Sequence, residues 1–205
     1  MPEPGTHRQL SHPGTASLPL LRPGVLLDRD GTIIVDYGYV GSVERVELIP
    51  GAAEAIASFN AAGIPVAVVT NQAGVARGYY GVADVEAVHE HLKGLLAAYG
   101  AYVDMFLYCP YHPEGAVQAF ARHSDDRKPA PGMAKAAAQA LGLDLSSSWV
   151  VGDRPEDMAL AQAIGATAAW VGHGPCPWPG ALAFPSLAAA APHILRSLTA
   201  ETDVG

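Results

Sequence analysis

Short apolar runs alternate along this chain with longer stretches of helical periodicity. The runs are too brief for helices and are typical of buried strands, which we expect over 25–27, 65–70, 104–108, 148–151 and 166–171. Apolar residues at helical spacing predict helices over 52–62, 82–99, 133–141, 155–164 and 187–198. His89 and His91 lie off the apolar face of the second of these helices, so we expect both to be solvated. The fivefold alternation predicts an α/β fold, a doubly wound, Rossmann-like parallel sheet of about five core strands.

The segments outside this repeat predict the domain organisation. Residues 1–22 are rich in Pro, Gly, Ser and Thr without periodicity, which predicts a mobile arm before one domain over 23–200 and a tail over 201–205. β-Branched and aromatic residues interrupted by glycines over 33–49 predict an irregular flap or hairpin. The intervals between strand ends are too short for a separate cap domain of about 50 residues or more, so we expect an open site.

Composition narrows the class of protein. The 205 residues are half hydrophobic and carry a formal net charge of −8, which argues against nucleic acid or an anionic membrane as a partner. Two cysteines, Cys109 and Cys176, are too few for a disulfide framework, and no apolar run reaches the roughly 18 residues that span a bilayer. With no signal-peptide pattern, these features predict a cytoplasmic protein. Nothing indicates an obligate interface, so we expect a monomer.

Polar residues follow three of the predicted strands. Asp28 and Asp30 come directly after the first strand, Thr70 ends the second and Asp153 follows the fourth, while Lys128 precedes a helix. Each alone has an ordinary structural interpretation, such as a turn, a helix cap or a solvated lysine. Because the carboxyl ends of parallel strands meet at one edge of a sheet, the set predicts a common site. Carboxylates brought this close repel each other, which favours a hard divalent cation such as Mg²⁺.

These residues suit phosphoryl transfer. Asp28 could attack phosphorus in line and form an aspartyl phosphate, while one oxygen of Asp28 and one of Asp153 bind the metal. Asp30 could offer its backbone carbonyl to the metal and use its carboxyl group as acid and base. Thr70 and Lys128 would stabilise the charge on the phosphoryl oxygens. Arg29, between the two acids, is interpreted as a structural spacer that points off the site.

The motifs DRDGT, TN, RKP and GDxxxD resemble those of the haloacid dehalogenase (HAD) superfamily of phosphohydrolases. The longer segments DRDGTIxxDxGYV, TNQxGxARG, CPxHP, RKPxPGM and GDxxEDM resemble the D-glycero-D-manno-heptose 1,7-bisphosphate 7-phosphatases and their histidinol-phosphatase relatives. The resemblance covers about residues 24–172. It implies that Asp28 is the nucleophile and Asp30 the acid and base, and that Thr70 and Lys128 stabilise the phosphoryl group. The Mg²⁺ ligands that it implies are Asp28, Asp30 and Asp153.

The resemblance also implies a substrate and the residues that contact it. The first candidate is the 7-phosphate of a heptose 1,7-bisphosphate, and the alternatives are histidinol phosphate or another small sugar phosphate monoester. A non-catalytic binding relative is the alternative outside enzymes, and the complete catalytic set argues against it. The implied substrate contacts are Asp36, Tyr37, Gly38, Tyr39, Asn71, Gln72, Ala73, Arg127 and Arg154. A second phosphate could be bound with help from Arg127, Arg77 and Arg154.

One departure from the family concerns zinc. Members often carry a structural zinc ion in the loop after the third strand, with a C-x-H and a C-x-C ligand pair. Here only Cys109 is retained, and the other three positions hold Tyr111, Ser124 and Asp126, so we expect no zinc. A shifted ligand set is the alternative: Cys109, His112, His123 and Asp126. We expect the loop to be held by packing of Tyr111 on Phe120 and by ion pairs among Arg122, Asp125, Asp126 and Arg127.

Overall fold

A computed structural model describes residues 21–172 and 176–200 of this chain. The expected N-terminal arm, apart from its last two residues, and the expected tail over 201–205 lie outside the described residues. Arg22 is paired by backbone hydrogen bonds to Gly142 and Asp144, at 3.1 and 2.9 Å. The chain is therefore attached to the folded body from Arg22 onward.

Six parallel strands form one sheet, with the order β3-β2-β1-β4-β5-β6. The strands are β1 (Val25–Leu27), β2 (Val66–Asn71), β3 (Met105–Cys109), β4 (Trp149–Gly152), β5 (Thr167–Val171) and β6 (Leu182–Phe184). β1 lies at the centre, where Leu26 pairs with Ala67 of β2 on one side and Val150 of β4 on the other. The strand order reverses direction between β1 and β4, and this switch point is where open α/β sheets bind ligands.

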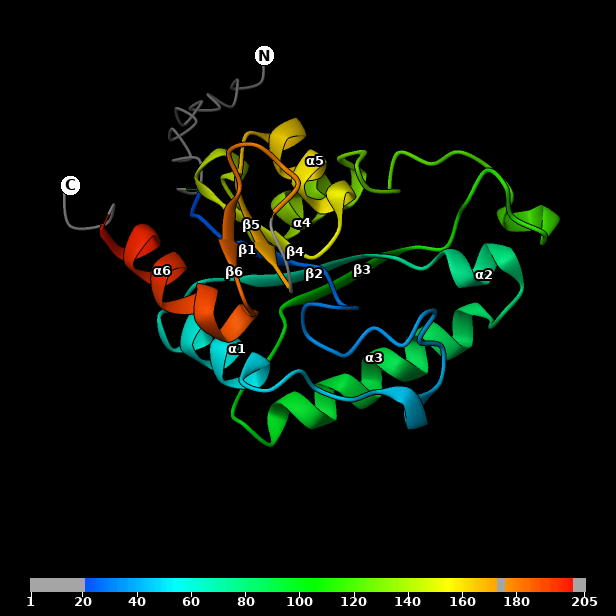
Figure 1. The fold of residues 1–205 in the computed structure, drawn as a ribbon, viewed down its shortest axis with the longest axis horizontal. Coiled ribbons are helices and arrows are strands. Elements are labelled where there is room, and N and C mark those ends of the chain that lie inside the picture. The colour runs from blue at the N-terminus through cyan, green and yellow to red at the C-terminus, as the bar shows by residue number, and fades with distance from the viewer. Residues whose placement is uncertain (1–20, 173–175, 201–205) are drawn as a thin grey trace, which may run out of the picture.

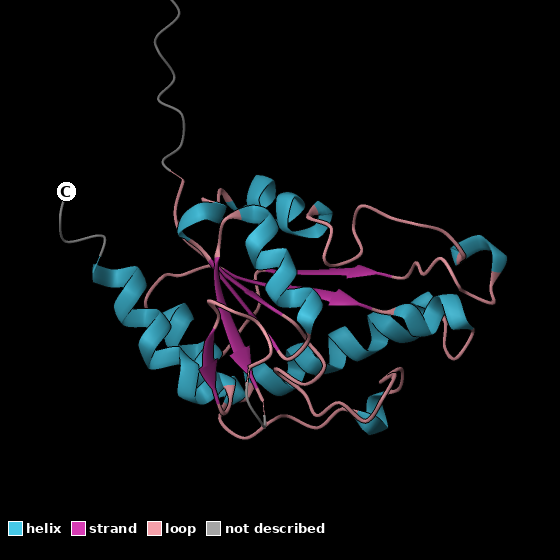
Figure 2. Ribbon diagram, turned by 45° about the horizontal axis from the view of Figure 1, so that its top comes forward, coloured by secondary structure: helices cyan, strands magenta, loops and turns pink. Residues whose placement is uncertain are grey.

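Helices cover both faces of the sheet (Figures 1 and 2). They are α1 (Ala52–Ala61), α2 (Ala73–Arg77), α3 (Val82–Ala97), α4 (Gly132–Leu141), α5 (Pro155–Ile164) and α6 (Leu187–Ala200), with short 3₁₀ helices η1 (Val43–Arg45), η2 (Gln118–Phe120) and η3 (Leu145–Ser147). Two apolar cores result. Val25 and Leu27 of β1 pack into the core under α1, α3 and α6, and Leu26 packs into the core under α4 and α5. This alternation follows from the period of two along a strand.

The predicted α/β architecture is confirmed, and the described residues contain no separate cap domain. The flap over 33–49 is an irregular hairpin, in which Ile34 bridges Leu48 and the backbone of Ile49 bonds that of Ile33 at 2.9 Å. Besides the short 3₁₀ helices, two elements of the described chain were not predicted. The short helix α2 lies in a glycine-rich segment interpreted as a loop, and β6 adds a sixth strand at the sheet edge. No helix of the described segments is long and apolar enough to cross a membrane.

His89 on α3 is buried, so the expectation that it is solvated was wrong; His91 is exposed as expected. The imidazole is 5% exposed and its ring lies 4.8 Å from that of Phe106 and 5.7 Å from that of Tyr108. Residue 89 follows Val85 by one helical turn, which places it at the edge of the apolar stripe. Burial, followed by the charges of Arg29 and Lys93, lowers the pKa of His89 to about 3.

This burial predicts a loss of stability in mild acid that one substitution should remove. The unfolded chain binds a proton at His89 below a pH of about 6.5, whereas the folded chain does so only near its lowered pKa, so stability falls across that window as the pH falls. Relative to the wild type, His89→Leu should gain about 2 kcal/mol of unfolding free energy between pH 8 and pH 5. Urea unfolding of both proteins at the two pH values measures the change. Equal pH dependence of the two proteins would contradict it.

Candidate active site

A cleft of about 580 Å³ opens at the carboxyl ends of the central strands. All four residues predicted to be catalytic line it: Asp28, Asp30, Thr70 and Lys128. Most of the predicted substrate contacts also line it: Asp36, Gly38, Tyr39, Asn71, Gln72, Ala73, Arg127 and Arg154. Three predicted residues are not part of its lining: Tyr37, Arg77 and Asp153. Four lining residues were not predicted: Tyr80, Pro155, Glu156 and Asp157.

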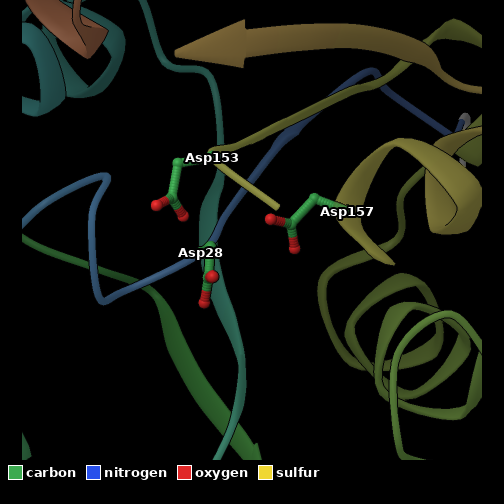
Figure 3. Close-up of side chains that lie close together, drawn as sticks. All are labelled: Asp28, Asp153 and Asp157. Carbon is green, nitrogen blue, oxygen red and sulfur yellow. The ribbon is translucent and has the colours of Figure 1, made fainter. Parts of the chain in front are cut away.

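Three aspartates gather beside this cleft (Figure 3). Asp28 follows β1, Asp153 follows β4, and Asp157 lies in the first turn of α5; one carboxylate oxygen of each lies within 4.8 Å of the others. Asp157 was not predicted as a site residue, although the GDxxxD motif contains it. The four-residue spacing, with Pro155 opening the helix, turns Asp157 back toward the strand end, where its carboxylate accepts the backbone N–H of Arg154 at 3.0 Å.

Two glycines make this close approach possible. A Cβ atom on Gly31, which has φ +79°, would lie 2.2 Å from a carboxylate oxygen of Asp153. A Cβ atom on Gly152 would lie 2.1 Å from a carboxylate oxygen of Asp157. Any side chain at either position would therefore displace an acid of the cluster.

Lys128 supplies the cation of the cluster. Its ammonium group is buried and lies 2.9 Å from Asp28 Oδ1 and 2.6 Å from Asp157 Oδ1. Burial opposes the charged form, but Asp157 and Asp28 outweigh it and raise the pKa of Lys128 above its ordinary value. Asn71 holds the lysine backbone: its side chain accepts the Lys128 N–H at 3.0 Å and donates to the Lys128 carbonyl at 3.1 Å. Asn71 therefore positions Lys128 besides lining the cleft.

The acids fit a hard divalent cation. Asp153 Oδ1 is buried and has no hydrogen-bond partner among the described residues. Burial, reinforced by the charge of Asp28, raises the pKa of Asp153 to about 6. The donors are carboxylate oxygens without thiolate or imidazole, a set that suits Mg²⁺. Asp28 and Asp153 are the residues that would hold the ion, since both oxygens of Asp157 already accept hydrogen bonds from Lys128 and Arg154.

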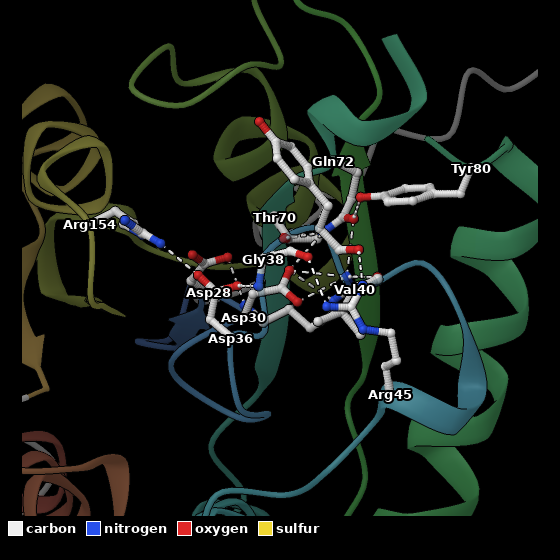
Figure 4. Close-up of polar contacts among 12 residues, drawn as sticks. Asp28, Asp30, Asp36, Gly38, Val40, Arg45, Thr70, Gln72, Tyr80 and Arg154 are labelled. Atoms are coloured by element: carbon white, nitrogen blue, oxygen red, sulfur yellow. Dashed lines mark hydrogen bonds and ion pairs between the residues drawn. The ribbon is translucent and has the colours of Figure 1, made fainter. Parts of the chain in front are cut away.

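Asp30 faces a different set of partners (Figure 4). Arg29 is fully buried and donates from Nε to Asp30 Oδ2 at 3.2 Å and from Nη2 to Asp30 Oδ1 at 3.1 Å. The interpretation of Arg29 as a spacer pointing off the site was therefore wrong. Burial raises the pKa of Asp30 even though the guanidinium of Arg29 lowers it, and the charge of Asp28 adds to the rise. A carboxyl group with a raised pKa suits the role of proton donor.

The outer rim of the cleft is organised by Asp36. Its carboxylate pairs with Arg154 at 2.6 Å and accepts the backbone N–H of Gly38 at 2.8 Å, which orders the turn before Tyr39. Tyr39 has φ 53° and its ring packs edge-on against Tyr79 at 4.8 Å.

The two other predicted substrate residues are placed elsewhere. Tyr37 is hydrogen-bonded to Glu47 of the flap. Arg77 ends α2, and its guanidinium Nε is buried without a partner among the described residues. Neither residue lines the cleft.

The loop after β3 is held by aromatic contacts. The rings of Tyr111 and Phe120 lie 5.9 Å apart, as expected, and the guanidinium of Arg122 stacks 3.9 Å from the centre of the Tyr111 ring. The ion pairs expected among Arg122, Asp125, Asp126 and Arg127 are absent from this part of the described chain. Stacking on Tyr111 is therefore the contact of the Arg122 guanidinium in place of the expected ion pairs.

The absence of zinc stays a prediction. The shifted ligand set of Cys109, His112, His123 and Asp126 does not gather within ligand distance in the described residues, where the aspartates form the one group of three or more candidate ligands. Burial also raises the pKa of the Cys109 thiol, which disfavours the thiolate that zinc requires. We expect elemental analysis of protein purified without chelator to find far less than one zinc ion per chain. One zinc per chain that survives dialysis would contradict this.

Comparison with known proteins identifies the family. A family model described as HAD-hydrolase-like matches residues 126–198. A D-glycero-β-D-manno-heptose-1,7-bisphosphate 7-phosphatase from Rhodopseudomonas palustris is 43% identical over 151 residues, which cover 74% of this chain and 83% of that protein. The enzyme of the same name from Escherichia coli K12 is also 43% identical, over 69% of this chain and 74% of its own length.

Solved structures agree with these relatives. A crystal structure of a HAD-like phosphatase from Mesorhizobium loti matches with a TM-score of 0.80 and 37% identity, covering 91% of this chain and 90% of that one. The D,D-heptose 1,7-bisphosphate phosphatase of B. bronchiseptica, complexed with magnesium and phosphate, matches with a TM-score of 0.73 and 31% identity over 85% and 98% of the two chains. The resemblance inferred from the motifs is confirmed. The chain therefore belongs to the HAD phosphatases and, among them, to the family of the D-glycero-β-D-manno-heptose-1,7-bisphosphate 7-phosphatases.

Proposed function

We propose that this chain removes the 7-phosphate from D-glycero-β-D-manno-heptose 1,7-bisphosphate. The observation that carries the reaction is the buried Asp28 carboxylate, bonded to Lys128 and facing the unpartnered oxygen of Asp153. The substrate is taken from the names of the relatives, which match this chain over at least two thirds of its length.

In the first step, Asp28 attacks the phosphorus atom and the bond from phosphorus to the sugar oxygen breaks, which leaves an aspartyl phosphate. The backbone N–H of Arg29 at 2.7 Å and the ammonium of Lys128 both bond Asp28 Oδ1, so the carboxylate is held in one orientation before substrate arrives. Lys128 and the Thr70 hydroxyl face the cleft, where they stabilise the charge on the phosphoryl oxygens.

Asp30 handles the protons of both steps. Its carboxyl group donates a proton to the departing sugar oxygen, and its carboxylate then takes a proton from the water that attacks the aspartyl phosphate, which returns Asp28 and releases phosphate. Asp28 and Asp153 would hold Mg²⁺, and the bound ion would supply positive charge that withdraws electrons from the phosphoryl group. The four carboxylates therefore have separate roles, and Asp157 acts through its ion pair with Lys128.

The outer parts of the substrate are assigned to the rim. Arg127 and Arg154 offer cations for the second phosphate, and Asp36, Gly38 and Tyr39 line the cleft with them. We propose that the protein works as a cytoplasmic monomer on this small molecule, with no nucleic-acid or membrane partner. The net charge of −8 supports the absence of an anionic macromolecule as partner.

A phosphate-release assay with and without Mg²⁺ tests the proposed function. The substrates are the β and α anomers of heptose 1,7-bisphosphate, histidinol phosphate and a simple alkyl phosphate. We expect kcat/KM for the β anomer to exceed that for histidinol phosphate by about 100-fold, and turnover of every ester to require Mg²⁺. Turnover of the bisphosphate no better than that of the alkyl phosphate would refute the substrate assignment.

The role of Arg127 can be tested separately. Arg127→Ala should raise KM for the heptose bisphosphate about tenfold or more, because a charged hydrogen bond to the second phosphate is lost. KM for p-nitrophenyl phosphate, which has no second phosphate, should stay nearly constant. Arg196→Ala, exposed on α6 and outside the cleft lining, is the control and should leave both values unchanged. An equal rise of KM for both substrates would remove Arg127 from the recognition of the second phosphate.

A further inference from the structure

Gln72 uses every donor and acceptor of its amide inside the protein. Its Oε1 accepts from Arg29 Nη2 at 3.0 Å and from the Tyr80 hydroxyl at 2.8 Å, and its Nε2 donates to Asp30 Oδ2 and Thr70 Oγ1, both at 2.9 Å. A primary amide has two donor hydrogens and two acceptor lone pairs, so none remains for a substrate. The side chain is also 2% exposed. Gln72 therefore lines the cleft without a polar group to offer it.

The neighbours determine which way the amide points. Arg29 can only donate hydrogen bonds, so the atom beside its Nη2 must be the carbonyl oxygen of Gln72. The carboxylate of Asp30 accepts, so the atom beside it must be the amide nitrogen. If the amide were flipped, its nitrogen would face the Arg29 donor and its oxygen would face the Asp30 acceptor, so neither hydrogen bond could form. The hydrogen-bonding partners of the amide therefore fix its orientation.

The Tyr80 hydroxyl holds the oxygen of this amide. Its ring lies between two backbone segments, and a Cβ atom on Gly41 or Gly74 would come within 2.1 or 2.3 Å of it. Burial, the largest effect, raises the pKa of Tyr80 to about 12, so its hydroxyl keeps its proton and remains a donor to Gln72. The two glycines thus make room for an aromatic ring whose one polar atom is used on Gln72.

Arg29 contacts both Gln72 and Asp30 and connects them to the flap. The two hydrogens of its Nη2 are shared among three acceptors: Gln72 Oε1, Asp30 Oδ1 and the backbone carbonyl of Val40 at 2.8 Å (Figure 4). Asp30 Oδ2 accepts from both Arg29 Nε and Gln72 Nε2, which uses its two lone pairs, whereas Oδ1 accepts only from Arg29 Nη2 among the described residues. Oδ1 is therefore the oxygen of Asp30 with capacity left to carry a proton.

We infer that Tyr80, Gln72 and Arg29 form a positioning unit for Asp30, which holds its carboxyl group so that Oδ1 exchanges protons with the leaving oxygen and with water. This inference rests on the proposed function, in which Asp30 is the acid and base. None of the three residues touches the reacting atoms. Their contribution should appear only where proton donation matters, that is, with substrates whose leaving group is a poor one.

The test compares kcat/KM for an alkyl phosphate, which needs a proton on its leaving oxygen, with that for p-nitrophenyl phosphate, which does not. Gln72→Met has nearly the shape of the wild-type side chain and removes all four hydrogen bonds. We expect its kcat/KM to fall about 100-fold on the alkyl ester and less than about fivefold on the nitrophenyl ester. Tyr80→Phe keeps the ring between the glycines and removes one hydrogen bond, so the alkyl value alone should fall about fivefold.

Two controls separate the possible failures. Asp30→Asn should show the same dependence on leaving group in a stronger form. Ser148→Ala removes a buried hydroxyl bonded to Gly24 at the opposite end of the sheet and should show no such dependence. Equal losses on both esters in Gln72→Met and Tyr80→Phe, or no loss in either, would overturn the positioning role. If Asp30→Asn shows no stronger dependence of kcat/KM on the leaving group than wild type, Asp30 is not the acid, and the positioning role fails as well. Because both assays use simple phosphate esters, neither outcome depends on whether the heptose bisphosphate is the substrate.

Discussion

Replacing Asp28 by asparagine should abolish turnover, with kcat lower by roughly 10⁴-fold or more. The amide has no charged oxygen with which to attack phosphorus, and it removes one of the acids expected to hold Mg²⁺. The fold should persist, because asparagine has nearly the same size and Lys128 keeps its 2.6 Å contact with Asp157. Phosphate release from heptose 1,7-bisphosphate and from p-nitrophenyl phosphate, at saturating Mg²⁺, measures the loss on a natural and on an activated ester.

A second measurement distinguishes loss of the nucleophile from loss of metal. Wild-type protein quenched in acid during turnover should carry a phosphoryl group on the peptide that contains Asp28, and the variant should carry none. Asp144→Asn is the control, since this acid bonds Ser146 and Ser147 beside η3, away from the cleft lining, and its replacement should leave turnover intact. Turnover of Asp28→Asn within tenfold of wild type would show that another group attacks phosphorus.

The sheet could be predicted because its three central strands, β2, β1 and β4, are buried on both faces. Such strands read as short, continuous apolar runs, and together with the periodicity of the intervening helices they placed the predicted strands and helices to within one or two residues. The short elements carried no such signal. α2 spans five residues, too few for a helical period, and its helix is stabilised by tertiary contacts and by Gly78 with φ 76° at its end. β6 is an edge strand of only three residues, largely exposed, and it follows a Pro- and Gly-rich segment.

The catalytic residues were found because they follow strand ends, where position in sequence determines position in space. Residues that act through side-chain direction were harder to place. Arg29 lies between two acids, and nothing in its neighbours along the chain reveals that its guanidinium turns inward to Asp30, Gln72 and Val40. Asp157 could have been predicted by the same reasoning, because side chains in the first turn of a helix after a strand point back to the strand end.

Lys128→Met should affect both stability and catalysis. Without Mg²⁺, we expect the free energy of unfolding to fall by about 3–5 kcal/mol, because removal of the buried ammonium leaves Asp28 and Asp157 buried without their cation. With saturating Mg²⁺, kcat should fall about 10²- to 10³-fold, since a cation that stabilises the phosphoryl oxygens is lost. Urea unfolding in chelator and steady-state phosphate release measure the two effects.

Magnesium should stabilise this variant more than it stabilises the wild type. An ion held by Asp28 and Asp153 binds the folded chain alone, and among the described residues no cation other than Lys128 contacts Asp28 and would compete with the ion. Lys135→Met, exposed on α4, is the matched control and should change unfolding by less than about 0.5 kcal/mol with or without the ion. Equal stability of Lys128→Met and the wild type in chelator would contradict the expected loss. The lysine would then serve the phosphoryl group alone, and its 2.6 Å contact with Asp157 would contribute little to the fold.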